Sequence, residues 1–271
     1  VDVVTGSSAA TDYEISQSSV SSAAAITPKA VTLSAAKVYD GTLDLNDAIV
    51  IDGLVTGESL VVFGALANDA NVATANKFIT TLDVSDGQSG LLSNYAIPTT
   101  LDASNAPVTI TPAPLTVTAA NDAKLLGQSD QAGYAGAFYN GFVNGETVTE
   151  LSGALVITRT NGDVNSEGTY VDVLQSGGWS STNYDIAFET GDYTIVGGDT
   201  LLLRTTVGGT QVYGSTPSYT FASAQYLDSD DAVVDLTGSI VTAGAQVTIS
   251  DGGESATFDV VPLGIQLSGA G

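Results

Sequence analysis

The sequence repeats itself with a period of about 85 residues, and this repeat constrains the fold more than any other feature of the chain. Ile26, Ile110 and Ile195 lie 84 and 85 residues apart, at the same place in successive repeats. An Asp-Tyr or Asn-Tyr pair precedes each isoleucine and a turn with glycine follows it; the tyrosines are Tyr13, Tyr95 and Tyr184, and the glycines are Gly41, Gly127 and Gly214. The period is too long for one coil of a solenoid and suits a small independent domain.

These landmarks divide the chain into four parts. Residues 1–28 match only the closing strand segment of a preceding or neighbouring repeat, residues 29–112 and 113–197 are complete repeats, and residues 198–271 are expected to form a third repeat that lacks its closing strand. The first two junctions carry the motif Ile-Thr-Pro. Because proline fixes its own backbone and restricts the residue before it, such a junction is stiff and extended. We therefore expect a semi-rigid row of modules.

The secondary structure within a repeat is expected to be mostly strand. Apolar residues alternate with Thr and other polar residues, and Val, Ile, Thr and Tyr dominate these segments. The segments are Leu115–Ala119, Ala154–Thr158, Thr169–Val173, Tyr184–Phe188 and, in the first repeat, Glu58–Phe63. Asn144 is expected to cap a short helix that ends near Gly153, and Asp228–Leu236 is expected to form a second one. The expected fold class is predominantly β, in the form of a β-rich α+β protein.

The amino-acid composition limits which partners the chain can bind and which reactions it can catalyse. Six Lys plus Arg stand against thirty Asp plus Glu, so we expect neither nucleic-acid binding, which needs clustered cations, nor adsorption to anionic membranes. No apolar run approaches the ~20 residues of a membrane helix, so we expect no membrane insertion. The chain has no Cys, His or Met, and therefore no thiolate nucleophile, imidazole base or soft metal ligand. We expect a protein that is not an enzyme and holds no cofactor.

Several motifs resemble the repeats of large bacterial surface proteins. Tyr39-Asp40-Gly41, with Asn94-Tyr95 and Ile110-Thr111-Pro112, looks like the YDG repeat of filamentous-haemagglutinin-like adhesins. The second repeat resembles the MBG repeat of the same proteins through Leu115–Ala119, Phe142–Glu146, Gly168–Tyr170 and Asn183–Ile186. The third is similar through Val212-Tyr213-Gly214, whereas the second departs from the pattern at Leu125-Leu126-Gly127, which lacks the tyrosine.

This resemblance implies a fold and a setting. It implies small β-grasp-like modules, each a sheet wrapped on a short helix, with a sandwich-like module as the alternative. Such modules act in series as spacers of extracellular or cell-surface adhesins and of biofilm-matrix proteins. The resemblance brings no catalytic residue with it.

Single residues supply further candidate sites. Trp179 stands among glycines and serines, where a tryptophan either stacks on a sugar as a ligand platform or packs into the protein. The tyrosines that follow Asp or Asn are expected to pack with a buried, hydrogen-bonded hydroxyl. The acidic segments Asp83–Gly87 and Asp228–Asp231 have the oxygen density that calcium requires, but neither forms an EF-hand loop, so solvated turns are the expectation.

The first 28 residues suggest how chains could associate. By the repeat spacing, the closing strand of the third repeat falls at the very end of the sequence, whereas residues 9–27 supply a spare strand of that type. Tyr13, Ile15, Val20 and Ile26 are therefore candidate strand-exchange residues, through which one chain completes the third module of the next and builds a filament. The alternative is that the sequence is a window of a longer protein.

These observations leave two functions in play. The first is a secreted structural protein, either a stalk or a fibre subunit, whose partners are flanking repeats or copies of itself. The second is a glycan- or surface-binding adhesin module in which Trp179 contacts the ligand. An ice- or mineral-binding face would need a flat regular array, which units of about 85 residues do not supply.

Overall fold

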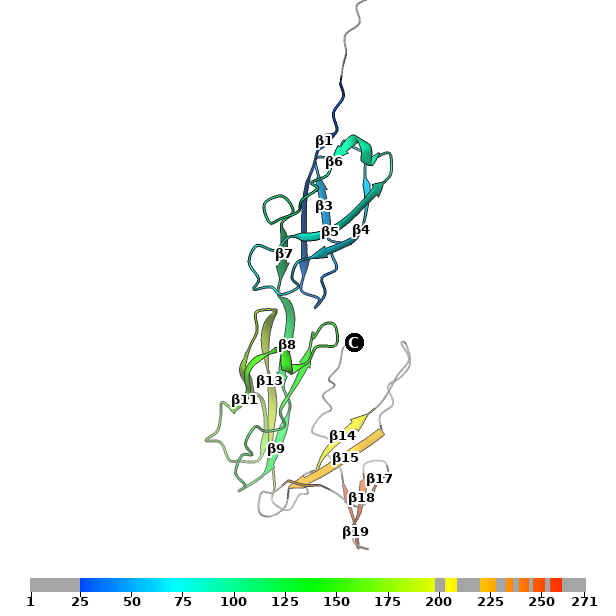
Figure 1. The fold of residues 1–271 in the computed structure, drawn as a ribbon. Coiled ribbons are helices and arrows are strands. Elements are labelled where there is room, and N and C mark those ends of the chain that lie inside the picture. Colours follow the sequence, from blue (N-terminus) through cyan, green and yellow to red (C-terminus); the bar gives the residue numbers. More distant parts are fainter. Residues whose placement is uncertain are drawn as a thin grey trace, which may run out of the picture.

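A computed structural model of the chain describes residues 25–197 and, in the third repeat, the backbone of the strands at 203–208, 220–227, 233–235, 239–243, 246–251 and 254–259. Residues 25–197 form two β modules stacked end to end (Figure 1). We call residues 29–112 module 1 and residues 113–197 module 2. Strands dominate both modules, which confirms the expected β fold class.

In module 1 the strands at the two ends of the module lie side by side. Its elements are β1 (Lys29–Ala30), β2 (Thr32–Val38), β3 (Ile49–Asp52), β4 (Leu60–Ala67), β5 (Ile79–Asp86), the 3-10 turn η2 (Leu92–Asn94), β6 (Tyr95–Ala96) and β7 (Val108–Thr111). β1 pairs in parallel with β6, and β2 pairs in parallel with β7. β3 pairs antiparallel with β2, and β4 and β5 form a hairpin.

Module 2 repeats this arrangement with longer strands. Its elements are β8 (Ala113–Ala119), β9 (Asp122–Leu125), β10 (Ala137–Asn140), the 3-10 turn η3 (Val148–Glu150), β11 (Ser152–Arg159), β12 (Gly168–Ser180) and β13 (Tyr184–Val196). The closing strand β13 pairs in parallel with β8 along its first half and with β9 along its second half. β10 pairs antiparallel with β8, and the hairpin of β11 and β12 adds to the other edge of β13.

Backbone pairing fixes which residues are equivalent in the two modules. The N–H of Tyr39 donates to the carbonyl of Thr111 over 2.8 Å, and the N–H of Leu126 donates to that of Val196 over 2.7 Å. Leu126 therefore occupies in module 2 the position that Tyr39 has in module 1. The repeated isoleucines pair with lysines at matching positions of β2 and β9, so the sequence repeat corresponds to a structural repeat.

The alternating pattern of the strands produces the core. β8 buries every second residue, as expected for a strand with one face against the interior. One cluster of buried side chains runs through both modules, with Leu33 and Ile79 from module 1 and Leu115 and Tyr184 from module 2. A smaller cluster around Leu174 lies in module 2 alone. The modules are thus joined by packed apolar surface as well as by the covalent chain.

The helix expected after Asn144 is wrong. The segment makes only the 3-10 turn η3, and its cap is the Thr147 side chain, which accepts from the N–H of Thr149. Asn144 and Gly145 have φ of 51° and 74°, so they form a turn with positive φ at both residues rather than a helix start. The β-branched residues that follow have low helix propensity. Residues 25–197 contain no α-helix, so the β-grasp expectation of a sheet around a helix is also wrong for the two described modules.

The described part of the third repeat is antiparallel sheet. β14 (Leu203–Gly208), β15 (Thr220–Leu227) and β16 (Val233–Asp235) form one three-stranded sheet, and β17 (Ser239–Ala243), β18 (Gln246–Asp251) and β19 (Glu254–Asp259) form another. β16 lies within the segment 228–236 for which a helix was expected, so that expectation is wrong for these three residues. Among all the described residues, no helix is long and apolar enough to cross a membrane.

Candidate functional site: the joint between the modules

Each module carries the same hydrogen-bonded pair of a tyrosine and a glutamate. The Tyr95 hydroxyl donates to Glu58 Oε2 over 2.6 Å, and the Tyr184 hydroxyl donates to Glu146 Oε2 over 2.5 Å. Each hydroxyl also accepts from the backbone N–H three residues before its glutamate, over 3.0 Å and 3.2 Å respectively. Both tyrosines are buried, Tyr95 at the start of β6 and Tyr184 at the start of the closing strand β13, which confirms for these two residues the expectation of packed tyrosines with bonded hydroxyls.

At the junction of the modules, a second tyrosine reaches the same glutamate. β2 ends at Val38, and the next residue, Tyr39, extends from module 1 into module 2. Its hydroxyl donates to Glu146 Oε1 over 2.7 Å, so each oxygen of this carboxylate accepts from one tyrosine. The rings of Tyr39 and Tyr184 meet edge to face with centroids 5.6 Å apart. Glu146 therefore connects the end of one module to the closing strand of the next.

The turn that follows Tyr39 fits closely against module 2. Gly41 has a φ of +73°, and a Cβ at this position would lie 2.9 Å from Asn144 Cβ and 3.0 Å from Glu146 Oε1. The Asn144 side-chain amide donates to the Gly41 carbonyl over 3.3 Å. Lys37 holds the turn through an ion pair of 2.7 Å with Asp40. Glycine adopts a positive φ at little cost and has no Cβ that would clash with Asn144 and Glu146, so this position requires glycine.

A second contact crosses the junction through Asn183. Its side-chain oxygen accepts from the N–H of Val72 over 2.9 Å, and its side-chain amide donates to Asn71 Oδ1 over 2.9 Å. Asn183 directly precedes Tyr184, whereas Asn71 and Val72 belong to the loop between β4 and β5. Two separate loops of module 1 therefore contact module 2, and two contacts restrict rotation between bodies more than one does.

Electrostatics keep the tyrosines of the joint in their donating form. Burial, and then the hydrogen bond to Glu146, raise the pKa of Tyr184 to about 12. The same two causes, in the same order, raise the pKa of Tyr39 well above its ordinary value. Both hydroxyls therefore stay protonated throughout the physiological range and can donate to the carboxylate.

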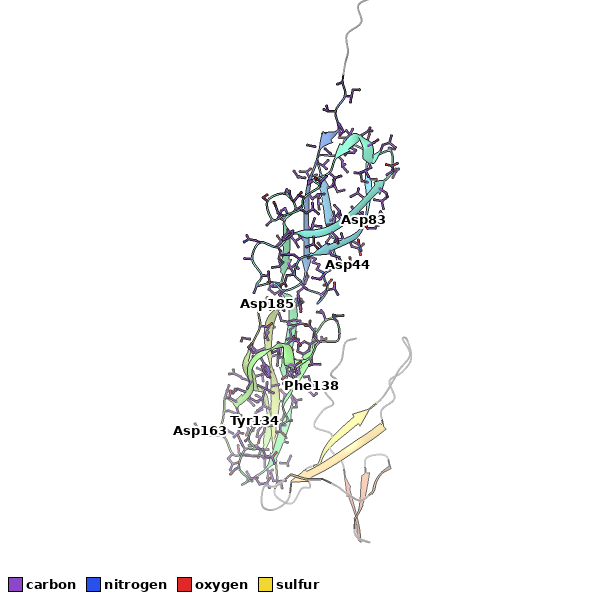
Figure 2. The ribbon with its side chains drawn as sticks, in the orientation of Figure 1. Asp44, Asp83, Tyr134, Phe138, Asp163 and Asp185 are labelled. Carbon is purple, nitrogen blue, oxygen red and sulfur yellow. The ribbon has the colours of Figure 1, made fainter. Side chains whose placement is uncertain are left out.

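A separate polar cluster stabilises the other end of module 2. Asp130 lies 2.8 Å from Lys124 Nζ and 2.9 Å from Arg159 Nε. The Arg159 guanidinium lies 4.6 Å from the centroid of the Tyr193 ring. The hydroxyl of Tyr134, which Figure 2 labels in module 2, donates to Asp130 over 3.0 Å. Burial opposes ionisation of Asp130, but the hydrogen bonds from Lys124 and Tyr134 and the charges of Arg159 and Lys124 together outweigh burial, so the pKa of Asp130 is lowered. The cluster ties β9, β11 and β13 together.

The predicted site residues are only partly covered by the structure. Tyr13, Ile15 and Val20 lie outside the described residues, whereas Ile26 is described and 98% exposed. Trp179 lies half-buried on β12, packs against the main core cluster and donates from its indole N–H to the Tyr139 hydroxyl over 3.0 Å.

The acidic segments are likewise only partly covered. Residues 83–86 end β5, where the Asp86 carboxylate accepts from the N–H of Leu92 over 2.7 Å. Residues 228–231 lie outside the described part. In the described residues, no three or more acidic side chains come together as a metal site would require.

Sequence reasoning missed the joint, although both halves of it stood in the motifs. Tyr39-Asp40-Gly41 and the glutamate of Val143-Asn144-Gly145-Glu146 were each recognised as repeat landmarks. The contact between them is visible only when two successive repeats are compared. Tyr39 binds Glu146 of the following module and not the equivalent glutamate of its own module.

Comparison with known proteins supports the repeat assignment. Residues 115–194 match the family model of the MBG domain of the YGX type. This match confirms the predicted MBG-like repeat and covers nearly all of module 2. Neither a curated protein nor a solved structure matches the chain.

Proposed function

We propose, with the MBG domain of residues 115–194 as the premise, that this chain is a non-catalytic structural stretch of an extracellular bacterial adhesin. Its modules act as a stalk, and its partners are the modules that flank them. MBG domains are typical of surface proteins, so the proposed setting follows the family. The observation that carries the proposal is the joint, in which Tyr39 of one module and Tyr184 of the next share the Glu146 carboxylate.

The joint has the properties that a stalk needs. Contacts by Tyr39 and by Asn183 lie on different loops, so bending that relieves one contact strains the other. The shared core cluster adds apolar burial across the junction, and separating the modules would return that surface to water. The modules would therefore keep a nearly fixed orientation, as a spacer that carries a binding region away from a cell surface requires.

The composition supports a structural role rather than a catalytic one. The chain has no histidine or cysteine, and both oxygens of Glu146 are occupied by tyrosine hydroxyls. A formal charge of −24 favours solubility and keeps neighbouring stalks apart by repulsion. The Glu146 carboxylate thus serves to orient two modules.

The stalk proposal is tested by the distribution of distances between the modules. Asp83 of module 1 and Asp163 of module 2 are exposed, and Figure 2 shows them on separate modules away from the joint. Since the chain has no native cysteine, Asp83→Cys and Asp163→Cys give a clean spin-label pair for pulsed electron paramagnetic resonance. We expect one narrow distance distribution.

Two variants make this experiment specific to the joint. Tyr39→Phe removes the hydroxyl that crosses the junction and should broaden the distribution. Tyr95→Phe removes a matching hydroxyl inside module 1 and should leave it narrow. A broad distribution in the protein with native Tyr39, or equal broadening by both variants, would contradict the proposal.

A further inference from the structure

The turn of module 2 that receives Tyr39 contains an Asn-Gly pair, in which the asparagine can lose its side-chain amide without an enzyme. The backbone nitrogen after an asparagine attacks the side-chain carbonyl carbon, and glycine hinders this attack least because it has no side chain. The chain holds three such pairs, which are Asn140-Gly141, Asn144-Gly145 and Asn161-Gly162. Their surroundings differ, and the difference separates Asn144 from the other two.

The surroundings of Asn144 leave the attacking nitrogen open. Asn144 and Gly145 are both exposed. The Gly145 N–H donates no hydrogen bond to residues 25–197, and a Cβ on Gly145 would meet no atom within 4 Å. One backbone hydrogen bond spans the turn in this part of the chain, from the N–H of Glu146 to the carbonyl of Val143 over 2.9 Å. The peptide between Asn144 and Gly145 can therefore rotate into the attacking position at low cost.

The other two asparagines are held in place. Asn140 ends β10, and the glycine after it packs so closely on the Pro114 carbonyl that a Cβ would overlap that oxygen. Asn161 has a buried side-chain oxygen, and the Arg159 guanidinium donates to the carbonyl of the following glycine over 3.0 Å. At both positions the attack requires local opening of the fold first.

We propose that Asn144 is a site of spontaneous deamidation, and that this modification loosens the joint between modules 1 and 2. The Gly145 nitrogen gives up its proton to the solvent and bonds to Asn144 Cγ, the bond from Cγ to Nδ2 breaks, and the amide nitrogen leaves as ammonia. Water then opens the cyclic succinimide at either of its carbonyls, which leaves aspartate or isoaspartate. Water is the co-reactant, and the step involves no oxidation or reduction.

Either product replaces a hydrogen-bond donor at the joint with an anion. The Asn144 amide donates to the Gly41 carbonyl over 3.3 Å, whereas a carboxylate oxygen in its place would face that carbonyl oxygen. Asn144 Nδ2 and Glu146 Oε1 lie 3.1 Å and 3.0 Å from the position of a Cβ on Gly41. The new charge therefore stands beside the carboxylate that accepts from Tyr39, and like charges at this separation repel.

Isoaspartate has a further effect, because it lengthens the backbone of the turn by a methylene group and shifts Glu146 relative to Tyr184. Loosening depends on the proposed function, since it is observable only if the joint orients the modules. The joint is then stiff in newly made protein and becomes flexible as the protein ages.

Incubation of the full chain in mildly alkaline buffer, below the range in which its tyrosines titrate, tests the selectivity of the reaction. Tandem mass spectrometry of proteolytic peptides follows the replacement of NH2 by OH at each asparagine. We expect Asn144 to react about tenfold faster than Asn140 or Asn161, because those two must first open. Equal rates at the three positions, or an earlier loss of another amide, would overturn the proposal.

The spin-label pair at positions 83 and 163 tests the consequence. The distance distribution of the native chain should broaden during incubation in step with deamidation at Asn144, and Asn144→Asp should give a broad distribution in fresh protein. Gly145→Ala slows the attack, and its methyl meets no atom within 4 Å, so this variant should stay narrow at a small cost in backbone strain.

Gln175→Glu provides the matched control, because it exchanges an amide for a carboxylate on an exposed residue of β12, outside the joint. Its distribution should stay narrow. A narrow distribution in Asn144→Asp, or in native chain that has lost the Asn144 amide, would show that the modification does not loosen the joint. The distribution in fresh native chain is measured before any deamidation, so the stalk proposal is judged separately.

Discussion

Glu58 and Glu146 are the same residue of two successive repeats, and the difference between them lies in what reaches their second oxygen. Glu58 accepts a hydrogen bond from Tyr95 at the start of β6, and Glu146 accepts one from Tyr184 at the start of β13. Only Glu146 also accepts from a tyrosine of the preceding module. One motif therefore has two uses: it closes its own module, and it receives the module before it.

Removing each carboxylate in turn tests most directly whether Glu58 and Glu146 contribute differently to stability. Glu146→Ala leaves the buried hydroxyls of Tyr39 and Tyr184 without their acceptor, which should lower the free energy of unfolding of module 2 by about 2–5 kcal/mol. Glu58→Ala deprives one tyrosine of its acceptor, in the other module. Trp179 is the chain's single tryptophan and lies in module 2, so its fluorescence in a urea titration follows that module.

The expected result is therefore asymmetric. Glu146→Ala should shift the Trp179 transition to a clearly lower urea concentration, whereas Glu58→Ala should leave it nearly in place and lower only the stability of module 1, followed by circular dichroism. Equal shifts of the Trp179 transition in the two variants would mean that the two glutamates do not differ in the way the joint requires.

Alkaline pH should weaken the hydrogen bond between Tyr184 and Glu146. The folded protein raises the pKa of Tyr184 from 10.0 to about 12. The unfolded chain loses this proton first, so the stability that the Tyr184 hydroxyl contributes is fully present below pH 10.0, declines above it and is lost as the pH passes about 12. The measurement is the difference in unfolding free energy between the native chain and Tyr184→Phe, at neutral pH and above pH 10.0.

That difference should shrink as the pH rises. Other tyrosines also titrate in this range, but they are common to both proteins and cancel in the difference. A difference that stays constant from neutral pH to above pH 10.0 would show that the hydroxyl is not held by the carboxylate.

The two glycine turns give a matched test of the joint itself. Gly41 lies two residues after Tyr39, and Gly127 lies one residue after the equivalent Leu126; their φ angles are +73° and +92°. Alanine at either position costs about 1–2 kcal/mol of backbone strain. At Gly127 the added methyl meets no atom within 4 Å, whereas at Gly41 it meets Asn144 and Glu146. Gly41→Ala should therefore broaden the distance distribution between modules 1 and 2, and Gly127→Ala should not.

The parts of the fold that follow from local sequence were predictable. Alternation of apolar and polar residues gave the strands, as in Leu115–Ala119, which lies within β8. The expectation of a helix after Asn144 is wrong because Asn144 and Gly145 both adopt positive φ angles. These angles form a turn, and the capping pattern in the sequence does not reveal them. The parallel pairing of first and last strands joins residues about 70 positions apart, such as Leu115 and Ile186, and no local pattern encodes it.

The candidate site was harder to predict for a related reason. The Tyr95 and Tyr184 hydroxyls were expected to be bonded, because a buried hydroxyl needs a partner, but the partner lies 37 or 38 residues away. The Tyr39 contact is 107 residues long in sequence and crosses a module boundary. It depends on how two folded modules stack, and stacking is determined by their surfaces rather than by the pattern within either repeat.

The smallest expected effect comes from the asparagines that precede the two tyrosines. Asn183→Ala removes two hydrogen bonds to Asn71 and Val72 that are partly open to solvent, and should destabilise the docked arrangement by about 0.5–1.5 kcal/mol. Asn94→Ala removes no hydrogen bond to the described residues and should leave both the Trp179 transition and the distance distribution unchanged in dilute monomer. Because the Tyr39 contact remains, Asn183→Ala should permit rotation about it and broaden the distance distribution less than Tyr39→Phe does. Equal broadening by the two variants would mean that neither contact suffices alone and that the modules are oriented only when both loops are engaged.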